Sequence, residues 1–136
     1  MQKCKFFLAL YLFLCPVVLF AETPIYTEEQ TLPITVTQAQ PKFIIRLKSN
    51  ATTGYQWSVR YNKMLFKAHH KYESSYDPAK KDQLIGAPGH ETWTFEYLPQ
   101  PMTSLAKVKS TDISFSYQRK WEKEPVNKLV FHVTLP

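Results

Sequence analysis

Cysteine is almost missing from this chain of 136 residues. Its two cysteines, Cys4 and Cys15, both fall within the first 21 residues. Without that segment, the remaining 115 residues (136 − 21) have no disulfide, no thiolate metal ligand and no cysteine nucleophile. Disulfide scaffolds, zinc-thiolate proteins and thiol enzymes are therefore excluded for the main part of the chain.

A long apolar run is also missing. The apolar stretch over 6–20 is shorter than the roughly 20 residues that a membrane-spanning helix needs. Lys3 and Lys5 precede it and Ala21 follows it, which is the layout of a cleaved export signal. We predict a signal peptide over 1–21, and a mature chain that is exported to the periplasm or the medium without a membrane anchor.

Helical periodicity is absent too, because no stretch of ten or more residues keeps an apolar stripe at helical spacing. Apolar and polar residues instead alternate, as at Phe43, Ile45 and Leu47, which is typical of half-buried strands. The strands expected from this pattern are Ile34–Thr37, Lys42–Lys48, Tyr55–Tyr61, Phe66–Tyr72, Glu91–Leu98, Thr111–Tyr117 and Lys128–Leu135.

Seven short strands without a helix predict an all-β fold, an immunoglobulin-like antiparallel β-sandwich over 33–136. Trp57 would be the large buried residue of the third strand. The polar segment 22–32, which contains Pro24 and no periodicity, is expected to be a flexible lead-in.

Metal binding and catalysis find little support. Adjacent strand residues point to opposite faces, so His69 and His70 do not easily share one ion. Serine, histidine and aspartate are present, but no serine lies in a recognisable nucleophile elbow. We therefore expect no metal, no cofactor and no enzymatic activity.

The chain is basic, with a formal charge of +6. Basic side chains on the outer faces of strands also keep sheets soluble and their edges unpaired. Because an exported chain rarely meets nucleic acid, we predict no nucleic-acid partner.

Three loop segments contain residue types suited to recognition. Gly54 permits a sharp turn with positive φ, and Arg119 and Trp121 are of the types most enriched at interface hot spots. Taken one at a time, they are equally consistent with a turn, a linker and a tryptophan folded onto the core. The segments are Asn50-Ala51-Thr52-Thr53-Gly54-Tyr55, Gly86-Ala87-Pro88-Gly89 and Arg119-Lys120-Trp121.

In order and spacing, these segments resemble the chagasin family of cysteine-peptidase inhibitors. That family has an immunoglobulin-like sandwich and three loop motifs, N-P-T-T-G-Y, G-x-G-G and R-P-W, side by side at one end. The resemblance spans about Ile34 to Leu135. The chain departs from the motifs at Ala51 and Lys120, where the family usually has proline, and at Pro88, where it has glycine.

The resemblance implies a reversible, tight-binding inhibitor of papain-like cysteine peptidases of the papain and cathepsin L type. The inhibitor would act as a monomer and insert its three loops into the active-site cleft. Thr52 would lie nearest the peptidase cysteine, Asn50 would brace the loop, Tyr55 would anchor it, and Trp121 would stack on the cleft wall. The residues implied to bind the peptidase are Asn50, Thr52, Thr53, Gly54, Tyr55, Gly86, Ala87, Pro88, Gly89, Arg119, Lys120 and Trp121.

Two alternatives remain at this point. An exported binding module for carbohydrate or protein would use Trp121 and exposed tyrosines as stacking surfaces, placed along a sheet face rather than at one end. An exported enzyme comes third. The sequence Asn50-Ala51-Thr52 is also an N-glycosylation acceptor, and a glycan there would obstruct the loop, so the inhibitor interpretation favours a bacterial source.

Overall fold

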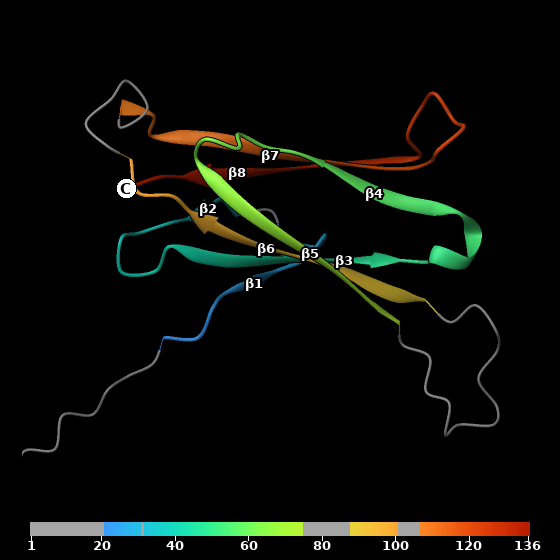
Figure 1. The fold of residues 1–136 in the computed structure, drawn as a ribbon, viewed down its shortest axis with the longest axis horizontal. Coiled ribbons are helices and arrows are strands. Elements are labelled where there is room, and N and C mark those ends of the chain that lie inside the picture. The colour runs from blue at the N-terminus through green and yellow to red at the C-terminus, as the bar shows by residue number, and fades with distance from the viewer. Residues whose placement is uncertain (1–20, 31, 75–87, 101–106) are drawn as a thin grey trace, which may run out of the picture.

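The computed structural model describes residues 21–30, 32–74, 88–100 and 107–136. The predicted signal peptide lies outside these residues, apart from Ala21. Within the described ranges the chain forms eight strands and one 3-10 turn, arranged as two sheets of four strands (Figure 1). The predicted all-β sandwich of immunoglobulin-like type is confirmed.

Each sheet has a core of three antiparallel strands and a short parallel strand at one edge. The first sheet has the spatial order β1 (Ile25–Tyr26), β3 (Lys42–Ser49), β6 (Gly89–Tyr97) and β5 (Phe66–Ser74). The second has the order β2 (Ile34–Thr35), β8 (Asn127–Thr134), β7 (Ser110–Arg119) and β4 (Tyr55–Arg60).

All seven predicted strands are present, with ends that differ by a few residues, and β1 is additional. It lies in the segment that the sequence predicts to be a flexible lead-in. Ile25 and Tyr26 pair in parallel with Ile44 and Ile45, and the Tyr26 ring packs edge-on against Phe43 with a centroid distance of 6.3 Å. Two residues are too few to produce a periodic signal, so this tertiary pairing is not evident from the sequence.

The core lies between the sheets and follows the alternation of the strands. Phe43, Ile45 and Leu47 of β3 are at most 1% exposed, and Phe95 of β6 stacks on Phe43 with a centroid distance of 5.3 Å. Trp57 of β4 is 9% exposed, as expected for the large buried residue of the third predicted strand. Each such large apolar side chain contributes about 1.5–3 kcal/mol through burial, which stabilises the sandwich without a disulfide.

The strand ends bring three chain connections to one end of the sandwich. Ser49 at the end of β3 pairs with Gly89, which also pairs with Ser74 at the end of β5. In the other sheet, Tyr55 at the start of β4 pairs with Arg119 at the end of β7. The connections that follow Ser49, Ser74 and Arg119 therefore all leave from this end, on the right in Figure 1. We call it the loop end.

Candidate functional site

The first connection at the loop end is a tight turn, Asn50–Gly54. Ala51–Thr53 form one 3-10 turn, and Gly54 closes it in the left-handed region with φ 78°. The N–H of Gly54 donates to the carbonyl of Ala51 (3.2 Å), and the N–H of Thr53 donates to that of Asn50 (3.2 Å). A residue with a Cβ is strained at this φ, so glycine is what allows the chain to enter β4 directly.

Asn50 braces the turn, but its side chain bonds the Thr52 hydroxyl rather than the loop backbone. Its side-chain oxygen Oδ1 accepts a hydrogen bond from the Thr52 hydroxyl (2.6 Å), and its backbone carbonyl accepts one from the Thr53 hydroxyl (2.6 Å). Thr52 and Thr53 are nevertheless exposed. The turn thus presents two threonines to solvent on a backbone that is already held in place.

Two tyrosines form the base of this turn. The Asn50 N–H donates to the hydroxyl of Tyr117 on β7 (3.1 Å), and the Tyr117 ring stacks on Tyr55 with a centroid distance of 5.3 Å. The Tyr117 ring also packs against Trp57, at 4.7 Å between centroids. Tyr55 therefore anchors the turn as predicted, and it does so through Tyr117, which the sequence analysis does not single out.

Arg119 joins the first connection to the third. Its Nε donates to the carbonyl of Thr53 (3.1 Å), and its guanidinium carbon lies 4.4 Å from the centroid of the Tyr55 ring and 5.8 Å from that of Trp121. Glu122 lies 3.5 Å from the guanidinium in the same segment. Because these contacts occupy the Arg119 side chain within its own chain, it supports the neighbouring tryptophan.

Trp121 is the exposed aromatic residue of the third connection. It is 73% exposed, and Lys120 beside it is exposed as well. A Cβ added at Gly54 would lie 3.3 Å from the Cη2 atom of Trp121, so the indole edge lies directly over the turn. The structure thus brings the Thr52–Thr53 pair and Trp121 together at one end, which the predicted arrangement requires.

The second predicted segment is described only in part. Gly86 and Ala87 lie outside the described residues, Pro88 is exposed, and Gly89 is buried as the first residue of β6. A Cβ at Gly89 would lie 2.5 Å from the carbonyl oxygen of Glu73 and 2.7 Å from the Tyr72 hydroxyl. Glycine is therefore required here for close strand packing, and Gly89 belongs to the support of the segment rather than to its surface.

Charges near the stem of this segment are paired. Lys71 donates a hydrogen bond to Glu73 (Nζ–Oε1 2.9 Å), and this bond, together with the lysine charge, holds the pKa of the exposed Glu73 carboxyl below its usual value. A lowered carboxyl pKa means that any stability it supplies is present at neutral pH and is lost as the pH falls through that pKa.

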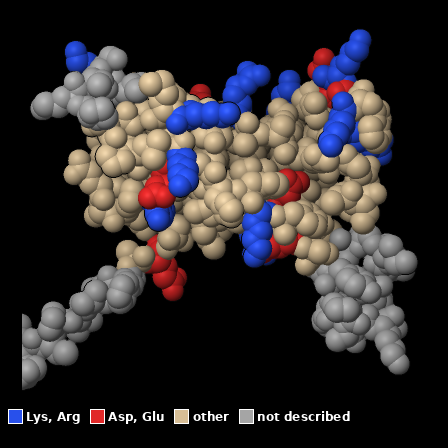
Figure 2. All heavy atoms as spheres, in the orientation of Figure 1, with Lys and Arg blue, Asp and Glu red and all other residues tan. Residues whose placement is uncertain are grey.

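Across the rest of the described surface, three basic residues form ion pairs with acidic ones. In Figure 2 the Lys and Arg side chains of the face in view are scattered, and several lie beside Asp or Glu. On this face the described side chains therefore form no continuous basic track of the kind that nucleic-acid binding uses. The ion pairs are Lys42–Glu96 (3.6 Å), Arg46–Glu73 (3.7 Å), Lys48–Glu28 (3.6 Å) and Lys48–Glu29 (3.5 Å).

Histidines and carboxylates do not assemble a metal site in the described part of the chain, where no three such side chains come together. His132 pairs with Asp112 (2.6 Å) on an exposed sheet face, and His70 contacts Glu91 (3.0 Å). Nor does any helix among the described residues have the length and apolar character to cross a membrane.

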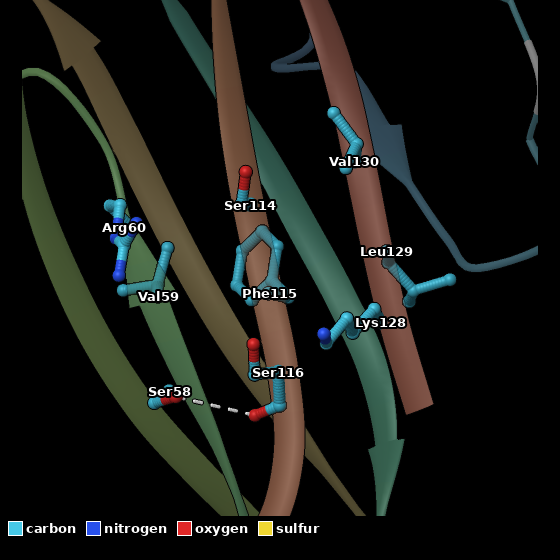
Figure 3. Close-up of a pocket in the computed structure, with 9 residues that line it drawn as sticks. All are labelled: Ser58, Val59, Arg60, Ser114, Phe115, Ser116, Lys128, Leu129 and Val130. Carbon is cyan, nitrogen blue, oxygen red and sulfur yellow. Dashed lines mark hydrogen bonds between the residues drawn. The ribbon is translucent and has the colours of Figure 1, made fainter. Parts of the chain in front are cut away.

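A shallow hollow on the outer face of β4, β7 and β8 bears on the alternative of a carbohydrate-binding module (Figure 3). Among its lining residues, all described, Phe115 is the one aromatic, and it is only 1% exposed because it belongs to the core. The hollow therefore lacks an exposed ring for stacking on a sugar, and this alternative is not favoured. Its lining is Ser58, Val59, Arg60, Ser114, Phe115, Ser116, Lys128, Leu129 and Val130.

Comparison with known proteins agrees with this geometry. The model of the chagasin family peptidase inhibitor I42 matches residues 37–135. No curated protein sequence matches the chain.

Two solved structures share the fold. The structure is similar to that of the cysteine protease inhibitor EhICP2 from Entamoeba histolytica, with a TM-score of 0.60 and 24% identity over 86% of this chain and 100% of that one. It is also similar to the solution structure of amebosin, with a TM-score of 0.51 and 18% identity over 85% and 97% of the two chains. At such identities the likeness concerns the fold.

Proposed function

Because the chain belongs to the chagasin family of peptidase inhibitors, we propose that it reversibly inhibits papain-like cysteine peptidases by inserting its loop end into their active-site cleft. Membership of this family confirms the family resemblance and makes the protein a peptidase inhibitor rather than an enzyme. The observation that supports insertion of the loop end is the exposed Thr52–Thr53 pair, which lies on a braced turn with Trp121 beside it.

Inhibition would follow because the turn brings hydrogen-bonding groups to the active site of the peptidase without presenting a peptide bond that can be cleaved. The active site of such a peptidase holds a thiolate–imidazolium pair in a long cleft. Thr52, nearest the thiolate, brings a hydroxyl whose single hydrogen would have to rotate away from Asn50 Oδ1, to which it is donated in the free protein. The 3-10 backbone of Ala51–Thr53 differs from an extended peptide and aligns no carbonyl for attack. The cleft is then filled and nothing is cut.

The flanks of the turn would contact the walls of the cleft. Trp121 is 73% exposed, so it can stack on apolar surface of one wall without a change of conformation. Lys120 adds a positive charge next to it. On the other side, contacts would come from Gly86, Ala87 and Pro88, and Gly89 would hold their base.

A braced surface of this kind reduces the entropy lost on binding. The hydrogen bonds of Asn50, Tyr117 and Arg119 already fix the turn in the free protein. Ordering a mobile side chain at an interface costs about 0.5–1.5 kcal/mol, so each group that is fixed beforehand saves part of that cost. This supports tight binding despite the missing prolines at positions 51 and 120.

The target peptidases, the oligomeric state of the inhibitor and its location are part of the same proposal. We propose papain and cathepsin L-type enzymes as the peptidases that this protein inhibits. One monomer suffices, since a single loop end fills a single cleft. Cleavage after Ala21 would release the inhibitor to the periplasm or the medium of a bacterial cell, and the mass of the exported protein tests this.

The experiment is a titration of the mature protein, residues 22–136, against papain and a cathepsin L-type enzyme, followed by hydrolysis of a fluorogenic peptide. A serine peptidase serves as the control. We expect saturable and reversible loss of both cysteine-peptidase activities at one inhibitor per enzyme, with the serine peptidase unaffected. Full activity of both enzymes at micromolar concentrations of folded protein would refute the proposal.

A further inference from the structure

A carboxylate lies between the two sheets directly beneath the Asn50–Gly54 turn. Glu91 of β6 is 5% exposed and occupies the inward phase of its strand, in line with the buried Trp93 and Phe95. An ionised carboxylate is costly to bury unless it is paired and hydrogen-bonded. Its neighbours are therefore informative about why it is there.

One oxygen of Glu91 contacts both stems of the turn. Oε1 accepts a hydrogen bond from the Ser49 hydroxyl (2.6 Å) and another from the backbone N–H of Trp57 (3.3 Å). Ser49 is the last residue of β3, immediately before Asn50, and Trp57 is the third residue of β4. The other oxygen, Oε2, lies 3.0 Å from Nε2 of His70 on β5.

The hydrogen bonds of Glu91 connect β3 to β4, which strand pairing does not do. β3 and β4 belong to different sheets, so no backbone ladder fixes the spacing of the two stems. A second contact acts at the same level, because Nε1 of Trp57 donates to the carbonyl of Lys48 on β3 (2.9 Å). Hydrogen bonds to an ionised acceptor are about twice as strong as neutral ones.

We propose that Glu91 is a positioning residue for inhibition: its carboxylate sets the separation of Ser49 and Trp57 and thereby the presentation of Thr52 and Thr53. A leucine of similar volume would fill the space between the sheets and spare the cost of a buried charge. It would leave the Ser49 hydroxyl and the Trp57 N–H without their acceptor. The effect on inhibition rests on the proposed function, whereas the effect on the turn does not.

The test uses Glu91→Leu and Glu91→Gln in the exported protein. The glutamine variant keeps an Oε1 acceptor for Ser49 and Trp57, whereas leucine keeps the volume alone. Hydrogen exchange is measured at the hydrogen-bonded amides of Asn50, Thr53 and Gly54, and the inhibition constant against papain is measured alongside. We expect Glu91→Leu to accelerate exchange at these amides and to raise the inhibition constant, each by about tenfold, and Glu91→Gln to restore most of both.

Ile113→Ala controls for loss of stability in general. Ile113 is 0% exposed near the start of β7, at the end opposite the loops, so this variant lowers the melting temperature without touching the turn. In this variant we expect the amides of Asn50, Thr53 and Gly54 to exchange at close to the wild-type rate, relative to the rest of the chain. The inhibition constant should also be close to the wild-type value.

Three results would overturn the proposal: wild-type exchange at the turn in Glu91→Leu, no rescue by Glu91→Gln, or an equal rise of the inhibition constant in Ile113→Ala. If the wild-type protein inhibits no cysteine peptidase, the proposed function fails, and the exchange measurement still decides the role of Glu91 in holding the turn.

Discussion

The hydroxyl of Tyr117 accepts a hydrogen bond from the backbone N–H of Asn50 across 3.1 Å. This contact joins β7, which leads into the Arg119–Trp121 segment, to the first residue of the threonine turn. Two of the three loops are therefore mechanically coupled before any peptidase binds. A change at Tyr117 should affect the inhibitory surface although the residue itself lies beneath it.

Tyr117→Phe removes the acceptor and keeps the ring that stacks on Tyr55. We expect a loss of about 1 kcal/mol in the free energy of unfolding, because the Asn50 N–H loses its partner, and a several-fold rise in the inhibition constant. Urea denaturation and a papain titration measure the two effects. Tyr97→Phe, at the opposite end of the sandwich, is the matched control, and an equal rise of the inhibition constant in that variant would contradict the coupling.

Trp121→Ala tests the exposed aromatic residue. The side chain is 73% exposed, so its removal should leave the melting temperature nearly unchanged. If it is a hot spot, the loss of binding free energy should be about 2 kcal/mol or more, which is roughly 30-fold in the inhibition constant. Met64→Ala removes a side chain of similar exposure, 65%, at the far end, and should have no effect. An unchanged inhibition constant for Trp121→Ala would remove this residue from the site.

Gly54→Ala tests the turn itself. At φ 78° a Cβ costs about 1 kcal/mol, and here it would also lie 3.3 Å from Trp121. We expect lower stability in urea together with weaker inhibition. Gly54→Asn should lose less stability, because asparagine tolerates the left-handed region better than alanine. The account is wrong about this turn if alanine is as stable as glycine.

Ala51→Pro restores a residue that the family motif usually has. Ala51 is the first residue of the 3-10 turn and follows Asn50, whose φ of −124° and ψ of 89° lie outside the helical region. Proline suits such a first position and should stabilise the turn by about 0.5 kcal/mol, which corresponds to roughly twofold tighter inhibition. Ala51→Gly should act in the opposite direction. We expect the inhibition constant to fall from glycine to alanine to proline at position 51. Any other order would exclude preorganisation of the turn as the cause of tighter inhibition.

The sequence predicts the long strands well because their burial obeys a period of two. At β3, Phe43, Ile45 and Leu47 face the core as the alternation requires. β1 is not predictable in this way, since two residues carry no period and pair only because β3 offers a free edge. The parallel pairing of β1 and β2 likewise depends on tertiary contacts.

The sequence predicts those residues of the site that lie within the three loop motifs. Asn50, Gly54 and Tyr55 have the roles that their residue types suggest, since each acts within the turn or directly beside it. Tyr117 and Glu91 act across strands that are far apart in sequence, so spacing does not reveal them. For Glu91 one signal exists: it is a charged residue on the apolar phase of an alternating strand.

The most direct test of the central claim is to map the surface that the peptidase covers. Backbone amide resonances of the isotopically labelled inhibitor are followed while a papain-like peptidase with its catalytic cysteine replaced is added. We predict perturbations at Asn50–Gly54, at Gly86, Ala87 and Gly89, and at Arg119–Glu122. The turns at 37–40 and 62–65 and the outer face of β8 should be unchanged. Perturbations centred on a sheet face or on the opposite end, or none at saturating peptidase, would contradict the account.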